Sequence, residues 1–331
     1  MKALVTGGGG FLGGALARRL LADGHEVFVL GRNRYPEMEA LGAKGVVADL
    51  ADRSRVVAAC AGMDVVFHVG AKAGLWGSFE DYYNSNVLAT INVLDGCREG
   101  GVRRLVYTSS PSVTFDGQDH LGADERLPYP RKFLNFYSQT KAMAEKLVLK
   151  ANGEHGVLTV ALRPHIIWGP GDNHILPRLI ARARQGKLLR VGDGSNRVDV
   201  TYVDNAVEAH VVAADRLEPG APLAGKAYFL SQGQPVVLWD WVNQWLERLG
   251  IAPVRRSIPF RAAYALGAAL ETAYGLLRKT EEPRMTRFLA CQLARSHYYN
   301  LEAARRDLSY QPAVGMAEGM DRTVERLISA P

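Results

Sequence analysis

The chain has 331 residues, of which 47% are hydrophobic, and its formal net charge is +6. Such a chain can bury a sizeable core, and its length indicates two domains or one large domain with an appendage. The basic residues form no stripe interleaved with aromatic residues, so nucleic acid is not expected as a partner. The positive excess suits an anionic cofactor or an anionic membrane surface equally well.

The three cysteines, Cys60, Cys97 and Cys291, lie far apart in the sequence, and none belongs to a Cys-x-x-Cys pair. This usage indicates a reducing compartment without a disulfide framework or a zinc site, and the eight histidines show no metal-ligand spacing. We find no signal peptide, and no apolar run reaches the roughly 18 residues that a membrane span needs. We therefore expect a cytoplasmic protein without a bound metal.

Short apolar strands alternate with helices through the first half of the chain. The predicted strands are Lys2–Thr6, Glu26–Leu30, Val46–Ala48, Asp64–Val69, Arg104–Thr108 and Thr159–Leu162. The predicted helices are Phe11–Asp23, a helix capped by Ser54 and ending at Ala61, Asn84–Glu99 and Tyr137–Lys150. Strands that are apolar along nearly their whole length are typical of a parallel sheet that helices cover on both faces.

After about Pro164 this alternation weakens, although helices are still expected at Leu176–Arg184 and Leu238–Leu249. We predict an α/β fold with a Rossmann-like, doubly wound parallel sheet. The NAD(P)-binding domain is expected at residues 1–163, with a return segment near 198–212. A smaller, mainly helical substrate-binding cap is expected at residues 164–331.

A glycine-rich turn follows the first predicted strand. Gly7, Gly10 and Gly13 have the spacing Gly-x-x-Gly-x-x-Gly, and Gly8, Gly10 and Gly13 also satisfy Gly-x-Gly-x-x-Gly. Either spacing allows a tight turn, a close approach of the backbone to a pyrophosphate, and a helix N-terminus that faces the phosphates. The cofactor-binding residues predicted here are Gly7, Gly10, Phe11, Leu12 and Gly13.

The end of the second strand indicates which dinucleotide binds. It reads Leu30-Gly31-Arg32-Asn33-Arg34 and lacks the acid that would hold the ribose 2′-hydroxyl of NAD. Arg32, with help from Arg34, can pair with the 2′-phosphate of NADP, whereas two solvated loop arginines are the alternative. We therefore expect NADPH, with NAD as the alternative cofactor. Asp49, after the third strand, is placed to meet the adenine, and the neighbouring Leu50 is included in the predicted cofactor site.

A tyrosine and a lysine lie four residues apart at the start of a predicted helix. Positions i and i+4 share one helix face, so the Lys141 ammonium is expected beside the Tyr137 phenol. A neighbouring cation lowers a tyrosine pKa from its usual value of about 10, which would make Tyr137 a better acid–base group. The fifth strand leads into Ser109 and Ser110, at the edge of the sheet that faces the ligand crevice. We favour Ser110 as the hydroxyl that donates to a substrate carbonyl.

These motifs, in this order and spacing, resemble the extended short-chain dehydrogenases/reductases over essentially the whole chain. The matching stretches are Thr6–Gly13, Asn86–Asn92, the strand before Ser110, Tyr137-x-x-x-Lys141, Arg163-Pro164 and Tyr202–Asp204. The resemblance implies hydride transfer with Tyr137 as the acid–base group, Lys141 on the nicotinamide ribose and Ser110 on the carbonyl. It also implies a supporting role for Asn86 and a cofactor contact for Pro164. Epimerases and dehydratases share the fold, so the resemblance does not fix the reaction.

Further stretches narrow this resemblance to the 3β-hydroxysteroid dehydrogenase branch, and to its bacterial reductases of olefin biosynthesis. They are Ala71–Gly77, Ser109–Val113, Ile167–Asp172 and Thr286–Leu289. This resemblance implies NADPH-dependent reduction of the 3-keto group of a large lipid-like substrate, from a 2-alkyl-3-oxoalkanoate to a 2-alkyl-3-hydroxyalkanoate. The alternative enzyme is a 3β-hydroxysteroid or sterol dehydrogenase that uses NAD(P). A nucleotide-sensing regulator is the rival from another class, and the intact Ser110, Tyr137 and Lys141 argue against it.

Substrate contacts are expected from Lys72, Trp76 and Trp168. Lys72 is the candidate partner of a substrate carboxylate, and a solvent-facing or cofactor-binding Lys72 is an equally supported alternative. The apolar stretch Ile258–Leu277 is interrupted by two charged residues, so it is not expected to span a bilayer. We expect a buried cap helix there, with an apolar lid at a membrane surface or partner enzyme as the alternative. A homodimer is also expected.

Overall fold

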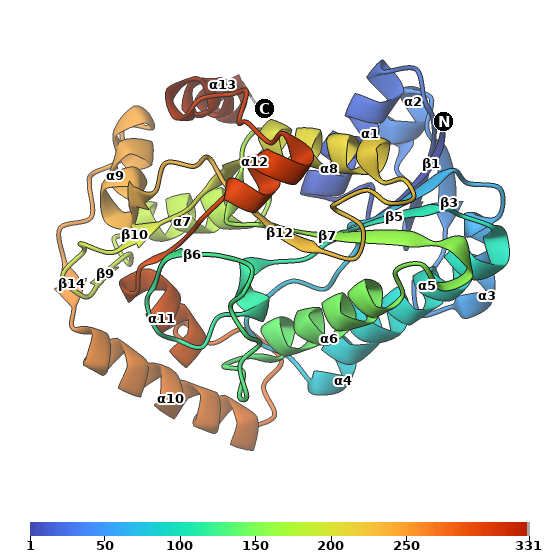
Figure 1. Cartoon of the computed structure of the whole chain (residues 1–331). Coiled ribbons are helices and arrows are strands. Elements are labelled where there is room, and N and C mark those ends of the chain that lie inside the picture. Colours follow the sequence, from blue (N-terminus) through green and yellow to red (C-terminus); the bar gives the residue numbers. More distant parts are fainter. Residues whose placement is uncertain (330–331) are drawn as a thin grey trace.

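The computed structural model describes residues 1–329 and has a seven-stranded parallel sheet at its centre (Figure 1). In spatial order the strands are β12 (Ala227–Leu230), β7 (Leu158–Pro164), β5 (Arg104–Thr108), β4 (Val65–His68), β1 (Lys2–Thr6), β2 (Glu26–Gly31) and β3 (Lys44–Val47). Every neighbouring pair is parallel. The direction of winding reverses between β1 and β4, and in folds of this kind ligands bind at the carboxyl ends of the strands near such a reversal.

Helices cover both faces of this sheet, which confirms the predicted α/β fold. One face carries α1 (Phe11–Ala22) and α8 (Val203–Arg216), and the other carries α3 (Arg53–Cys60), α5 (Ala89–Gly100) and α6 (Phe136–Lys150). Alternate residues of each strand point to opposite faces. Val5 therefore joins the α1 and α8 side of the core, while its neighbour Leu4 joins the α3, α5 and α6 side.

Several local predictions differ from the structure. Helix α3 begins at Arg53, because the Asp52 carboxylate accepts a hydrogen bond from the Arg55 N–H at 3.2 Å. Ser54 lies inside the first turn and donates to Asp52, so its prediction as the cap is wrong. Strand β3 ends at Val47, one residue before the predicted end. The predicted helix Asn84–Glu99 begins as a π-helix, Tyr83–Leu88, before α5.

The sheet also takes a strand from the second half of the chain. After the return segment, which forms α8, β12 pairs with β7 and completes the sheet. The sequence analysis missed β12. A smaller four-stranded sheet contains β13 (Val236–Val237), β10 (Arg197–Val198), β15 (His297–Tyr299) and β6 (His120–Ala123). Two short pairs are β11 (Thr201–Tyr202) with β8 (Ile167–Trp168), and β14 (Ser257–Ile258) with β9 (Arg190–Val191).

The remaining helices lie mainly in the second half. They are α7 (Ile175–Arg184), α9 (Leu238–Arg248), α10 (Phe260–Leu276), α11 (Arg287–Ala294), α12 (Glu302–Leu308) and α13 (Met316–Ser329), together with α2 (Pro36–Ala40) and α4 (Phe79–Tyr82). Two single turns of 3-10 helix cover Pro111–Val113 and Glu154–Gly156.

Helix α10 lies at the outer edge of the molecule and packs against α11 (Figure 1). Only Ala263 and Gly267 of α10 are buried, so the expectation of a buried cap helix is wrong. Its outward side chains include Leu266 and Leu276, which are 45% and 80% exposed. Within residues 1–329, none of the helices combines the length and the apolar character that crossing a bilayer requires.

Candidate active site

The glycine-rich turn joins β1 to α1 and is shaped to receive an anion. Gly7 has a φ of 67°, and a Cβ on Gly13 would lie only 2.3 Å from the Gly7 carbonyl oxygen. Helix α1 begins after Gly10, with neither a side-chain cap nor an acid in its first turn. Its first N–H groups are therefore open to a ligand, and the turn fits the pyrophosphate of a dinucleotide. Phe11 and Leu12, which follow, are the first residues of this helix.

A buried network of polar side chains stabilises the end of β1, from which this turn begins. The Thr6 hydroxyl accepts a hydrogen bond from the Gly70 N–H at 3.0 Å, and a second hydrogen bond of 2.8 Å joins it to Nδ1 of His68. Nε2 of His68 lies 2.9 Å from the Thr90 hydroxyl of α5. Burial lowers the pKa of His68 to about 3, so the ring stays neutral. The sequence analysis missed this network, although Thr6 and His68 end adjacent strands.

The end of β2 presents one arginine free of ion pairs. The Arg34 guanidinium bonds Glu39, with 2.6 Å between Nη2 and Oε2. Arg32 is exposed and makes no ion pair within residues 1–329. Arg32 is therefore the better placed of the two for a phosphate. Asp49 is exposed after β3, and the carbonyl of Leu50 beside it accepts a hydrogen bond from the Asn92 amide at 2.8 Å.

Tyr137 and Lys141 occupy the first turns of α6, as the spacing predicted. The helix begins after Asn135, whose side chain accepts a hydrogen bond from the Ser138 N–H at 2.8 Å. The Ser110 hydroxyl lies close enough to the Tyr137 phenol to act on its pKa. Ser109 is buried, whereas Ser110 faces Tyr137, which supports Ser110 as the residue that meets a carbonyl.

The electrostatics of this pair differ from the sequence-based expectation. Burial raises the pKa of Tyr137 above its ordinary value, although the neighbouring Ser110 hydroxyl opposes that shift. The expected lowering by Lys141 is wrong, because the Lys141 ammonium donates to the Thr108 carbonyl at 2.5 Å instead. It also lies 4.2 Å from the centre of the Tyr107 ring. Burial lowers the pKa of Lys141 to about 7, against the opposing charge of Glu145.

Glu145 belongs to a buried ion pair that the sequence analysis did not identify. Its carboxylate accepts hydrogen bonds from Arg163 at 2.8 and 2.6 Å and from the Tyr129 hydroxyl at 2.7 Å. Burial favours the neutral acid, but the Arg163 guanidinium holds the pKa of Glu145 below its usual value. The signal was present in the spacing, because Glu145 lies one helical turn after Lys141. Pro164 follows Arg163 and is buried at the end of β7.

Asn86 connects the loop after β4 to α6, the helix that carries Tyr137 and Lys141. Its side-chain oxygen accepts from the Lys72 N–H at 2.7 Å, and its amide donates to the Lys72 carbonyl at 3.2 Å and to the Thr140 hydroxyl at 3.0 Å. The Lys72 ammonium lies 3.3 Å from a carboxylate oxygen of Asp81 and 5.1 Å from the centre of the Tyr82 ring. Lys72 thus already has a carboxylate partner within the protein.

The two tryptophans predicted to contact substrate have different surroundings. The Trp76 indole donates a hydrogen bond to the Lys279 carbonyl at 2.9 Å, so the loop after β4 touches the segment after α10. Trp168 is completely buried against Trp241 and Trp245 of α9. This position gives Trp168 a packing role in the core and does not support the predicted substrate contact.

An apolar cluster lies between the α10–α11 hairpin and three loops, which are the loop after β4, the loop after Ser110 and the loop before α6. Phe115, five residues after Ser110, packs edge to face against Phe288 of α11, with 5.8 Å between the ring centres. Leu134, three residues before Tyr137, joins the same cluster. The other members are Leu75, Phe260, Tyr264 and Cys291. We call these seven residues the apolar wall, because they place hydrocarbon next to these three loops.

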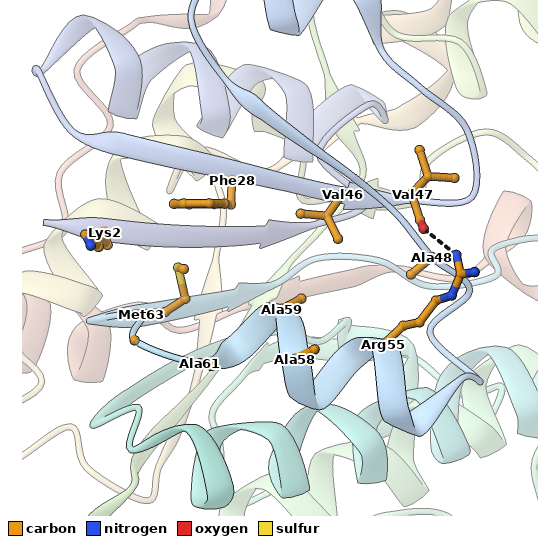
Figure 2. Close-up of a pocket in the computed structure, with 11 residues that line it drawn as sticks. Lys2, Phe28, Val46, Val47, Ala48, Arg55, Ala58, Ala59, Ala61 and Met63 are labelled. Carbon is orange, nitrogen blue, oxygen red and sulfur yellow. Dashed lines mark hydrogen bonds between the residues drawn. The ribbon is translucent and has the colours of Figure 1, made fainter.

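A separate pocket lies between β2, β3 and α3 (Figure 2). Phe28, Val46 and Met63 line it, and Arg55 donates a hydrogen bond to the Val47 carbonyl at 3.0 Å at one end. None of its lining residues belongs to the catalytic or cofactor-binding sets. The candidate active site is therefore the crevice at the carboxyl ends of the strands rather than this pocket.

Known proteins with similar sequences and folds point to the same chemistry. The profile of the 3-beta hydroxysteroid dehydrogenase/isomerase family matches residues 4–260. A 2-alkyl-3-oxoalkanoate reductase of Stenotrophomonas maltophilia is 52% identical over 325 residues, which cover 97% of this chain and 98% of the relative. The 3beta-hydroxysteroid-dehydrogenase/decarboxylase isoform 1 of Arabidopsis thaliana is 39% identical over 97% of this chain and 78% of its own. Among solved structures, MoeE5 in complex with UDP-glucose and NAD has a TM-score of 0.77 at 25% identity, over 99% of both chains.

Proposed function

The chain belongs to the 3-beta hydroxysteroid dehydrogenase/isomerase family and is an NAD(P)-dependent oxidoreductase. We propose that it reduces the 3-keto group of a 2-alkyl-3-oxoalkanoate with NADPH. The observation that carries the proposal is the approach of Ser110 to Tyr137, with Lys141 one turn later on α6 and the apolar wall on the flanking loops. The similarity to a reductase named for this substrate supports the same assignment.

The cofactor would lie along the carboxyl ends of the strands. The residues that would hold it are Gly7, Gly10, Phe11, Leu12, Gly13, Arg32, Asp49, Leu50, Tyr137, Lys141 and Pro164. When bound, NADPH supplies the hydride that reduces the ketone carbon. Arg32 would neutralise the 2′-phosphate, so Arg32→Ala should weaken NADPH binding at least about tenfold and leave NADH binding nearly unchanged. Equal losses for both dinucleotides, measured by fluorescence titration, would reject this role.

The polar residues divide the work at the ketone oxygen. Ser110 would donate a hydrogen bond to this oxygen, and Tyr137 would deliver the proton that completes the alcohol. The raised pKa of Tyr137 keeps its phenol protonated near neutral pH, as a proton donor requires. Lys141, held by the Thr108 carbonyl, would bind the nicotinamide ribose.

The two alkyl chains of the substrate would pack against the apolar wall. Trp76 would close one side of this space through its bond to Lys279. Lys72 is our candidate for the substrate carboxylate, and it would exchange Asp81 for the substrate. Lys72→Met should then lower kcat/KM for a β-keto acid but not for a neutral ketone of similar size. Equal effects on the two ketones would remove Lys72 from the substrate site.

A sterol dehydrogenase is the second candidate function, because the Arabidopsis thaliana relative named as a 3beta-hydroxysteroid-dehydrogenase/decarboxylase matches nearly the whole chain. Purified protein should be assayed by loss of NADPH absorbance with a 2-alkyl-3-oxoalkanoate and with a neutral 3-keto steroid. We expect the larger kcat/KM for the keto acid. Faster turnover of the steroid would favour the second function.

We further propose that the outer face of α10 rests on a membrane surface. Leu276 and the following Leu277 are 80% and 66% exposed, and Arg278 and Lys279 follow them directly. Leu276→Asp/Leu277→Asp should abolish flotation with anionic liposomes, whereas the control Ile328→Asp, 71% exposed on α13, should not. A wild type that does not float would reject the membrane contact.

We also propose that the protein is a homodimer. A sedimentation mass of one 36.2 kDa chain would reject the dimer.

A further inference from the structure

The aromatic side chain of Tyr35 leaves no room for a side chain at two positions near the cofactor turn, Gly9 and Gly31. Gly9 lies in the turn, at a position that the Gly7, Gly10 and Gly13 spacing leaves free. A Cβ on Gly9 would nevertheless lie 1.9 Å from Cε1 of Tyr35. At the end of β2, a Cβ on Gly31 would lie 2.3 Å from the Tyr35 hydroxyl oxygen. The Tyr35 side chain therefore lies across the turn and reaches the end of β2.

The backbone of Tyr35 is fixed by the short helix that follows it. Tyr35 precedes α2, and its carbonyl accepts hydrogen bonds from the N–H groups of Met38 and Glu39 at 2.9 and 3.0 Å. Pro36 at the first helical position restricts the chain further. Met38 is buried, which anchors α2 to the core. The ring of Tyr35 is half-buried over the turn as a result.

The Tyr35 hydroxyl lies close to the chain segment that carries Arg32, the residue expected to bind the adenosine ribose phosphate. It lies next to Gly31, the residue before Arg32, and makes no hydrogen bond within the described residues 1–329. Arg34, the other cation of this segment, is occupied by Glu39. The end of the second strand is where such folds distinguish a ribose 2′-hydroxyl from a 2′-phosphate. The segment at the end of β2 thus carries a phenol without a hydrogen-bond partner and a guanidinium without an ion pair among the described residues.

We propose that Tyr35 is a second determinant of the preference for NADPH, and that its hydroxyl donates a hydrogen bond to the adenosine 2′-phosphate beside Arg32. The inference rests on the proposed use of NADPH. A phosphate has several strong acceptor oxygens, so it can take bonds from the phenol and the guanidinium together. A ribose 2′-hydroxyl offers no charge, so the Tyr35 bond is worth more with NADPH than with NADH.

The test is the affinity of Tyr35→Phe for the two dinucleotides, measured by isothermal titration calorimetry. The variant keeps the ring over Gly9 and removes only the hydroxyl. We expect the Kd for NADPH to rise about tenfold, because hydrogen bonds to charged groups are the stronger class, and the Kd for NADH to stay the same. Tyr298→Phe, which removes a hydroxyl from a half-buried tyrosine on β15, is the matched control and should change neither affinity.

Three results would overturn the proposal. An unchanged Kd for NADPH would mean that the hydroxyl does not contact the phosphate. Equal losses for NADPH and NADH would mean that Tyr35 contacts a part common to both cofactors. Tighter binding of NADPH by the variant would mean that Tyr35 obstructs the site. A wild type that prefers NADH would instead contradict the cofactor assignment itself, so the two failures are distinguishable.

Discussion

The parallel-sheet half and the α10–α11 hairpin bury their side chains to different degrees. In the sheet half, even polar residues such as His68, Glu145 and Arg163 are buried and bonded to partners. The hairpin meets the rest of the molecule through two small clusters, and much of α10 faces outward. Few buried contacts make a segment easier to open locally. We infer that the sheet fixes the reacting groups, whereas the hairpin moves to accommodate an apolar substrate.

The largest expected effect comes from removing the Tyr137 hydroxyl oxygen in the parallel-sheet half. Tyr137→Phe removes the proton donor and leaves the turn and the buried networks intact. We expect kcat to fall about 10²–10⁴-fold while NADPH affinity is kept, because general acid catalysis contributes on that order. Steady-state kinetics and a binding titration measure the two quantities. Near-normal kcat would place the proton donor elsewhere.

The second prediction concerns the cost of burying Lys141. Burial lowers its pKa from 10.5 to about 7, so between these values the unfolded chain binds more protons at this site than the folded chain. The resulting destabilisation is fully present below about pH 7 and disappears as the pH rises through about 10.5.

In the absence of cofactor, Lys141→Met should therefore raise the free energy of unfolding at about pH 6 by a few kcal/mol, since each pKa unit corresponds to about 1.4 kcal/mol. The difference from the wild type should shrink toward about pH 10. Denaturant titrations at several pH values measure it. A difference that does not change with pH would show that Lys141 is not buried as described.

The smallest effects compare the same substitution in the two regions. In α10, a Cβ on Gly275 would meet no atom within 4 Å, so Gly275→Ala should stabilise the protein by up to about 1 kcal/mol through helix propensity. In α1, Gly13→Ala would press against the Gly7 carbonyl and should destabilise by about 1–3 kcal/mol. Thermal unfolding of both variants measures the contrast. Changes of equal sign would remove the distinction between the regions.

Much of the sheet could be predicted because its strands are local, apolar and regularly spaced. The family resemblance drawn from the motifs is likewise confirmed. Strand β12 escaped prediction because its four apolar residues follow the region where the alternation of strands and helices weakens, and its place is set by pairing with β7. The cap of α3 was misplaced because Asp52 and Ser54 are both suitable capping residues, and the structure uses the earlier one.

The candidate site was predictable where a motif constrains the backbone, as at Gly7 and Gly13. Surroundings that depend on distant residues were not. The burial of Trp168 depends on α9, more than seventy positions later, and the pairing of Lys72 with Asp81 depends on a loop conformation. The direction of the Tyr137 pKa shift also escaped, because burial raises that pKa and the Lys141 ammonium is directed to the Thr108 carbonyl.

We propose that a hydride is delivered to a 3-keto carbon at this site. The most direct measurement uses NADPH deuterated at the transferring position of the nicotinamide, a 2-alkyl-3-oxoalkanoate, and mass spectrometry of the product. We predict a 2-alkyl-3-hydroxyalkanoate with one deuterium at C3, formed by the wild type and nearly absent with Tyr137→Phe. An unlabelled alcohol, or no reduction of the keto acid by the wild type, would contradict the account.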